Sequence, residues 1–205
     1  TGLHPPAIEM IPEIFALHSA DSLIPLLEDL PPASQVMLLS QLGHFPLPEM
    51  RDAVLNSLDN PEPAVRMAAL DALAEMGDGS SVDPVARFAA AAQGPEKEAA
   101  RRCLAEMTGS GVNQAVLTGF VKCGNMDVKK EYLLAIKNRH VSQSRTLLFQ
   151  AMSGEIPEIK AIAAEVFREF AQAADLPGLI QIYTDTENET VLQELQKTIA
   201  VSASH

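Results

Sequence analysis

The segment Pro63-Ala-Val-Arg-Met-Ala-Ala-Leu-Asp-Ala-Leu-Ala-Glu-Met76 decides the fold. It predicts a helix, because proline presets the backbone of a first helical turn and Gly77 follows the last periodic residue, where we expect a left-handed glycine. Its apolar residues recur with the period of one helical face, here called the stripe. The stripe consists of Val65, Ala68, Ala69, Ala72, Leu73 and Met76. The small residues at its centre would let another helix approach closely.

The stripe returns along the chain at intervals of about 31 residues. A shift by 94 positions gives Ile159, Ile162, Ala163, Val166, Phe167 and Phe170. A shift by 31 positions gives Glu96, Ala99, Ala100, Cys103, Leu104 and Met107. Less regular copies contain Met37, Leu38 and Leu42, then Val128, Tyr132 and Ile136, and finally Val191, Leu195 and Ile199. Units of this length, each holding two short helices, are typical of a solenoid.

A second set of helices is expected between these copies. The segments are 22–30, 47–58, 82–91, 112–122, 142–152 and 176–183. Three of them begin alike, at Leu23, Val82 and Leu176, and carry a proline in the first turn, where its missing N–H has no intrahelical partner. We call the first helix of each unit the A helix and the second, which carries the stripe, the B helix. No alternating run is long enough to predict a strand.

These residues resemble the HEAT-repeat family in its bacterial HEAT-like form, such as the PBS-lyase-type HEAT repeats. The motif Pro-x-Val-Arg-x-Ala-Ala carries the resemblance at Pro63, Val65, Arg66, Ala68 and Ala69. The Val-x-Pro-Val opening of an A helix adds Val82, Pro84 and Val85. The resemblance covers roughly residues 21–200. In one copy Lys130-Glu131-Tyr132 replaces the small pair of the stripe, so that interface should pack differently.

The resemblance implies an all-α fold, a right-handed α–α superhelix of about six helical hairpins. It also implies that A helices form the convex face, that B helices line the concave face, and that the fold binds other macromolecules. We expect one repeat array over residues 21–205. Residues 1–20 should form a capping helix left from a longer chain, because the ends of a solenoid expose apolar faces unless they are capped.

The charge of the chain bears on its partners. The net charge is −12, which disfavours nucleic acid as a ligand because phosphate backbones are repelled. Residues 1–63 contain nine acidic residues and only Arg51 as a base, whereas residues 64–170 contain thirteen of each sign. The middle repeats are therefore the only candidate electropositive surface. No apolar run approaches the length of a membrane-spanning helix.

The sequence contains no recognisable catalytic, cofactor or metal motif. The five histidines are scattered, no two of them three or four positions apart, and neither a nucleophile motif nor a phosphate-binding loop is present. The glycine clusters 77–81 and 109–111 are interpreted as turns between a B helix and the next A helix. Cys103 is expected to be a buried apolar residue, and a bridge to Cys123 is left open.

Basic residues follow two ridges of the B helices. Arg66, Lys97, Lys129 and Lys160 come directly after the first stripe position. The neighbouring ridge contains Arg101, Arg102, Lys130, Lys137 and Arg168. One interpretation is a ladder of ion pairs between repeats, in which the Arg66 series meets Glu62, Glu96, Asp127 and Glu158. The other is a docking groove for an acidic peptide or protein surface on the second ridge.

The sequence therefore predicts a non-enzymatic protein-binding scaffold that needs no cofactor and uses the concave face of the B helices. Its partner would be a protein or peptide, acidic in character, or another domain of the same parent chain. The alternative is an accessory module that positions a catalytic domain of a larger multidomain enzyme. Nothing in the residues assigns the chain to a cellular compartment.

Overall fold

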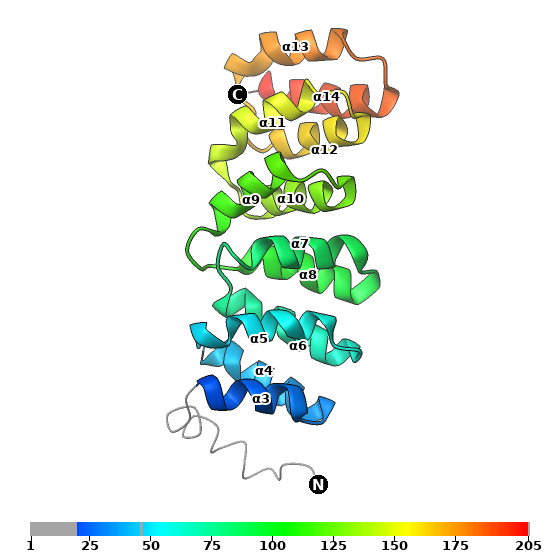
Figure 1. Ribbon diagram of the computed structural model, residues 1–205. Coiled ribbons are helices and arrows are strands. Elements are labelled where there is room, and N and C mark those ends of the chain that lie inside the picture. The colour runs from blue at the N-terminus through cyan, green and yellow to red at the C-terminus, as the bar shows by residue number, and fades with distance from the viewer. Residues whose placement is uncertain (1–19, 46, 205) are drawn as a thin grey trace. The chain divides into compact units, whose positions relative to one another are not determined.

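A computed structural model describes residues 20–45 and 47–204 (Figure 1). The expected capping helix within residues 1–20 lies almost entirely outside this range. The described residues form twelve α-helices and no strand. The A helices are α3 (Ala20–Asp29), α5 (Arg51–Asn56), α7 (Val82–Ala91), α9 (Val112–Lys122), α11 (Arg145–Met152) and α13 (Leu176–Thr184). The B helices are α4 (Pro32–His44), α6 (Pro63–Met76), α8 (Gly94–Glu106), α10 (Met126–Asn138), α12 (Pro157–Phe167) and α14 (Glu189–Ser202).

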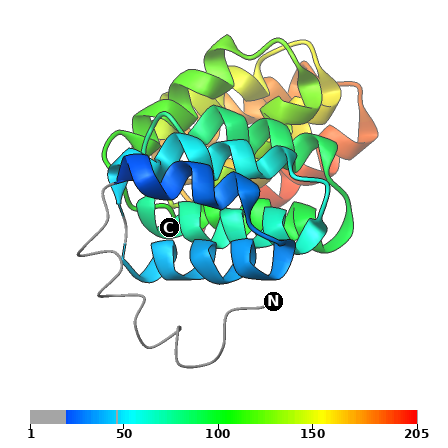
Figure 2. The ribbon, with the colours of Figure 1, turned by 60° about the horizontal axis from the view of Figure 1, so that its bottom comes forward.

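Helices alternate as predicted, so the all-α repeat class is confirmed. Short 3-10 turns precede or follow three of the A helices; they are η1 (Pro48–Met50), η2 (Ser57–Asp59), η3 (Ser142–Ser144) and η4 (Ala173–Asp175). The chain divides into two compact units, residues 1–116 and residues 117–205. In the first unit α6 packs between α4 and α8 (Figure 2). In the second unit α12 packs between α10 and α14. The right-handed superhelix that the resemblance implies stays a prediction.

The stripe forms the core of each unit. Val65, Ala99 and Ile159 occupy equivalent or neighbouring stripe positions in three repeats, and their exposed fractions are 0%, 2% and 6%. The B helices α6, α8 and α12 thus turn their apolar faces toward neighbouring helices, which confirms the register read from the sequence in these three repeats. Burial of a large apolar side chain stabilises a fold by about 1.5–3 kcal/mol, so the repeated stripe is the main source of stability.

The first B helix departs from the predicted register. Met37 and Leu38 of α4 are only half-buried, whereas Leu39 is fully buried, so the prediction for the first two residues was wrong. The helix is rotated because Gln35 takes an interior position. Its amide nitrogen donates to the Leu27 carbonyl at 2.8 Å, and its amide oxygen accepts from Asn60 at 3.0 Å. A satisfied amide can occupy an interior site that an apolar pattern would not assign to it.

Gly77 ends α6, but not in the left-handed conformation that we expected. Its φ is −69° and its ψ is 151°, so the backbone is extended. Lack of space explains the glycine instead, since a Cβ atom would lie 2.5 Å from the Leu73 carbonyl oxygen and 2.9 Å from the end of the Met107 side chain.

The two glycine clusters stack on each other in the first unit. The Gly79 N–H donates to the Ser110 carbonyl at 2.9 Å. A Cβ atom on Gly109 would lie 2.1 Å from the Gly77 carbonyl oxygen, closer than real contacts allow. These turns therefore join successive repeats through the backbone, which goes beyond the simple helix-ending role predicted for them.

The copy that lacks the small pair packs differently, as expected. Tyr132 of α10 is fully buried. A Cβ atom on Gly119 of α9 would lie 2.3 Å from its ring, so the close approach of the two helices depends on a glycine in the A helix. In this repeat the small residue at the interface, Gly119, therefore lies in the A helix and not in the B helix.

We predict that Gly109→Ala destabilises the protein by about 1–3 kcal/mol, because the added Cβ must push the stacked turns apart. Urea unfolding followed by circular dichroism measures this effect. The matched control is Gly124→Ala, also in a loop, where the added Cβ meets nothing within 4 Å and the change should stay within about 0.5 kcal/mol. Equal effects of the two substitutions would contradict the role assigned to the stacked turns.

Candidate protein-binding surface

The five candidate cations lie on the solvent side of the B helices, in two groups. Arg101 and Arg102 belong to α8 of the first unit. Lys130 and Lys137 belong to α10 of the second unit, where Arg168 follows α12. The structure thus divides the five residues between the two compact units.

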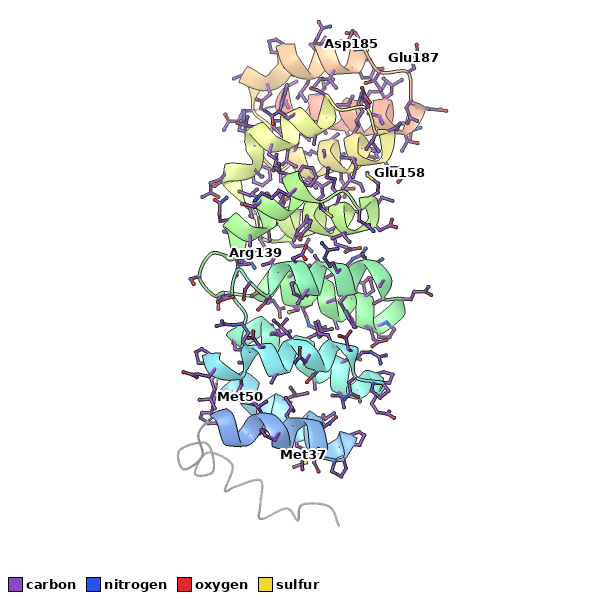
Figure 3. The ribbon with its side chains drawn as sticks, viewed as in Figure 1. Met37, Met50, Arg139, Glu158, Asp185 and Glu187 are labelled. Atoms are coloured by element: carbon purple, nitrogen blue, oxygen red, sulfur yellow. The ribbon has the colours of Figure 1, made fainter. Side chains whose placement is uncertain are left out.

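Several of these cations reach a carboxylate on a neighbouring B helix. Arg102 meets Asp71 of α6 at 2.9 Å. Lys130 meets Glu158 at the start of α12 at 2.7 Å (Figure 3), and Lys137 meets Glu165 of the same helix at 2.6 Å. Arg168 pairs with Glu194 of α14. The partners are 26 to 31 residues apart, so each pair joins successive repeats.

Arg101 meets a carboxylate of its own helix, as Lys130 also does with Asp127. Its guanidinium meets Glu98 at 3.1 Å, three positions earlier in α8. All five candidates are therefore ion-paired, and the surface around them is balanced in charge. The hydrogen bond to Glu158 raises the pKa of Lys130, and the hydrogen bond to Asp71 raises the pKa of Arg102, so both cations stay charged.

On the other ridge, Arg66 forms the predicted inter-repeat pair. Arg66 meets Glu96 at 2.6 Å and donates to the Asn60 carbonyl at 2.6 Å. Lys129 instead lies over the Phe120 ring, with its Nζ 5.3 Å from the ring centroid. Lys160 donates to the Thr186 hydroxyl at 3.2 Å. The ladder interpretation, offered for the Arg66 series, thus applies to the second ridge as well.

An open groove in the first unit was not anticipated from the sequence. It lies between α4 and α6 and has a volume of about 740 Å³. Its lining residues are Val36, Ser40, Gly43, His44, Ala64, Met67, Ala68, Asp71, Ala72 and Glu75. Gly43 faces Ala72, and a Cβ atom on Gly43 would lie 3.6 Å from the Ala72 Cα. The spacing of Ala64, Ala68 and Ala72, one helical turn apart, was the available signal for a narrow ridge at the edge of the stripe.

The groove has an apolar floor and one acidic side. Ala68 and Ala72 are buried, Val36 and Met67 are half-buried, and Asp71 is exposed. Glu75, one turn further along α6, is exposed as well and has no ion-pair partner among the residues that the structure describes. The groove therefore offers apolar contact area and negative charge together.

In the part of the chain that the structure describes, the cysteines and potential metal ligands do not form a recognisable catalytic arrangement. Burial raises the pKa of Cys103, which keeps the thiol protonated and unreactive. Cys103 and Cys123 are both free thiols. Among residues 20–45 and 47–204, no three or more His, Cys, Asp or Glu side chains gather as metal ligands would. None of the described helices is long and apolar enough to span a membrane.

Comparison with known proteins identifies the class of repeat. A model of the family described as HEAT repeats matches residues 20–105, so this segment is similar to that family. Members of the family commonly act as protein–protein interaction scaffolds and are generally non-catalytic. No curated protein matches the sequence. Among solved structures, the chain is similar to an engineered protein with 13% identity and a TM-score of 0.45, over 91% of this chain and 97% of that chain.

The Arg66–Glu96 pair predicts a specific pH dependence. The hydrogen bond from Arg66 lowers the pKa of Glu96. The pair therefore stabilises the folded state at pH values above the ordinary pKa of a glutamate, which is about 4.3. That contribution is lost as the pH falls through the lowered folded-state pKa. In Arg66→Gln, we expect the pKa of Glu96 to rise toward its ordinary value and less of the free energy of unfolding to be lost between pH 7 and pH 3.

Carboxyl NMR titration of Glu96 and urea unfolding at the two pH values test this expectation. Arg87→Gln is the matched control, because Arg87 pairs with Asp83 inside one helix at an exposed site. It removes the same charge and should leave the pKa of Glu96 unchanged. An unchanged Glu96 titration in Arg66→Gln would rule out the assigned pairing in solution.

Proposed function

We propose that the chain is a non-catalytic protein–protein interaction scaffold that binds its partner on the solvent side of the B helices. The open groove between α4 and α6 carries this proposal, because it lies within the segment matched by the HEAT-repeat family. A repeat array suits this role, since the stripe supplies the stability and leaves the outer positions of each B helix free for recognition.

The five paired cations contribute to this surface as exchangeable contacts. Surface ion pairs are worth about 0–1 kcal/mol each, so a carboxylate of a partner can replace Glu158 beside Lys130 at little net cost. Because each cation already has a carboxylate neighbour, the ion pairs give less support to an acidic partner than the sequence alone suggested. Arg101, Arg102, Lys130, Lys137 and Arg168 are proposed as part of the binding face, not as an open positive groove.

Site-specific photocrosslinking tests which face binds. A photoreactive amino acid at Ser40 of α4 or Gln193 of α14 samples the B-helix side, and the same residue at Asp52 of α5 or Ile180 of α13 samples the A-helix side; all four positions are exposed. We expect one partner to crosslink from the B-helix positions several times more strongly than from the A-helix positions. Crosslinks confined to the A-helix positions would reject the proposed face. A partner that proves to be a catalytic domain of the parent chain would support the accessory-module alternative.

Charge substitutions test the paired cations separately. If Arg101 and Lys130 contact the partner, Arg101→Gln with Lys130→Gln should weaken its binding by about 3- to 10-fold at low salt, with the loss fading at high salt. The control Arg87→Gln with Lys122→Gln removes two cations from A helices. Equal binding by both double variants would exclude Arg101 and Lys130 from the binding face.

A further inference from the structure

The groove between α4 and α6 has a chemistry that restricts what it can bind. We infer that it binds a helical segment of a partner protein that is apolar along one face and carries Lys or Arg along the edge of that face. This inference rests on the proposed function and specifies the partner class. It reverses the sign of the charge that the sequence suggested for the partner.

The floor of the groove determines that the bound segment should have an apolar face. Met67 and Val36 contribute half-buried side chains, and Gly43 contributes none, so the α4 backbone lies close to Ala72 at the floor. A volume of about 740 Å³ lies in the range of ligand-binding clefts and can receive several apolar side chains. An amphipathic helix binds in such a groove through apolar side chains spaced three and four positions apart.

The charged residues at the rim of the groove determine which charge the bound segment should carry. Asp71 and Glu75 lie one turn apart on α6, whereas α4 contains no Lys, Arg, Asp or Glu. Arg102 offsets part of this charge, through its ion pair with Asp71. Residues 20–116 contain fourteen acidic and six basic residues, a net charge of −8, so the field of the first unit adds to the attraction for a cationic segment.

Charge disfavours the two occupants that the chain itself could provide. Residues 1–19 are rich in apolar side chains, but they contain Glu9 and Glu13 and no Lys or Arg. A second copy of the chain would bring a net charge of −12 toward an acidic rim. A basic segment of another protein satisfies both the apolar floor and the rim.

Fluorescence anisotropy with two synthetic helices of 18 residues tests the inference on the full chain. Both helices carry the same leucine face, and their remaining positions are Lys in one helix and Glu in the other. We expect the Leu/Lys helix to bind at least 10-fold more tightly than the Leu/Glu helix at low salt, and its affinity to fall as salt screens the rim.

Isosteric substitutions locate the binding. Asp71→Asn with Glu75→Gln should weaken binding of the Leu/Lys helix by about 5- to 20-fold at low salt. Glu49→Gln with Asp52→Asn is the matched control, since it removes two exposed carboxylates of the same unit outside the groove and should change binding less than 2-fold. Gly43→Leu should fill the groove and weaken binding at low and high salt alike, with Gly43→Ala as its control.

Several results would overturn the inference. They are no binding of the Leu/Lys helix to the natural chain, equal binding of the two helices, and equal binding by the groove variant and its control. Displacement of the Leu/Lys helix by a synthetic peptide of residues 1–19 would identify that segment as the occupant, and a dimer in sedimentation would identify a second copy. Crosslinking of a natural partner from Ser40 would uphold the proposed function even where the basic helix fails to bind.

Discussion

The burial of one apolar face of each B helix against the helices beside it is the interaction on which the structure depends. Val65 in α6 and Ile159 in α12 occupy the same position of this face, and both are buried. A single helical pair could not cover such a face, because the apolar side of one B helix is completed only by its neighbours in the array. Stability therefore accumulates from one repeat to the next.

Close approach of helices, both between and within repeats, limits the residues that can stand between them. In the first unit the limit falls on the backbone, where Gly77 and Gly109 meet with no room for a side chain. In the second unit it falls on Gly119, which lies against the ring of Tyr132. Different positions thus meet the same requirement, since a bulky residue on one helix can be matched by a glycine on the other.

The B helices show that the number of cations on a surface does not by itself determine the electric field there, because neighbouring carboxylates can cancel it. Lys130 and Lys137 lie on one ridge, but each faces a carboxylate of α12. Paired charges of this kind leave little net field, and they contribute little to affinity until a partner exchanges with them. By contrast, the α4–α6 groove retains the unbalanced charge of Glu75 beside an apolar floor, which makes it the more selective surface.

The sequence by itself determined the helical repeats, the stripe and most of the helix boundaries, because these follow from local periodicity and from the positions of proline and glycine. It also determined that Val65, Ala99 and Ile159 would be buried, since one face of a helix must point inward. Only the tertiary structure decided which carboxylate meets Lys130, how Gln35 rotates α4, and that a groove opens over Gly43. Those features depend on distances between residues about 30 positions apart, and the pattern within one helix contains no information about them.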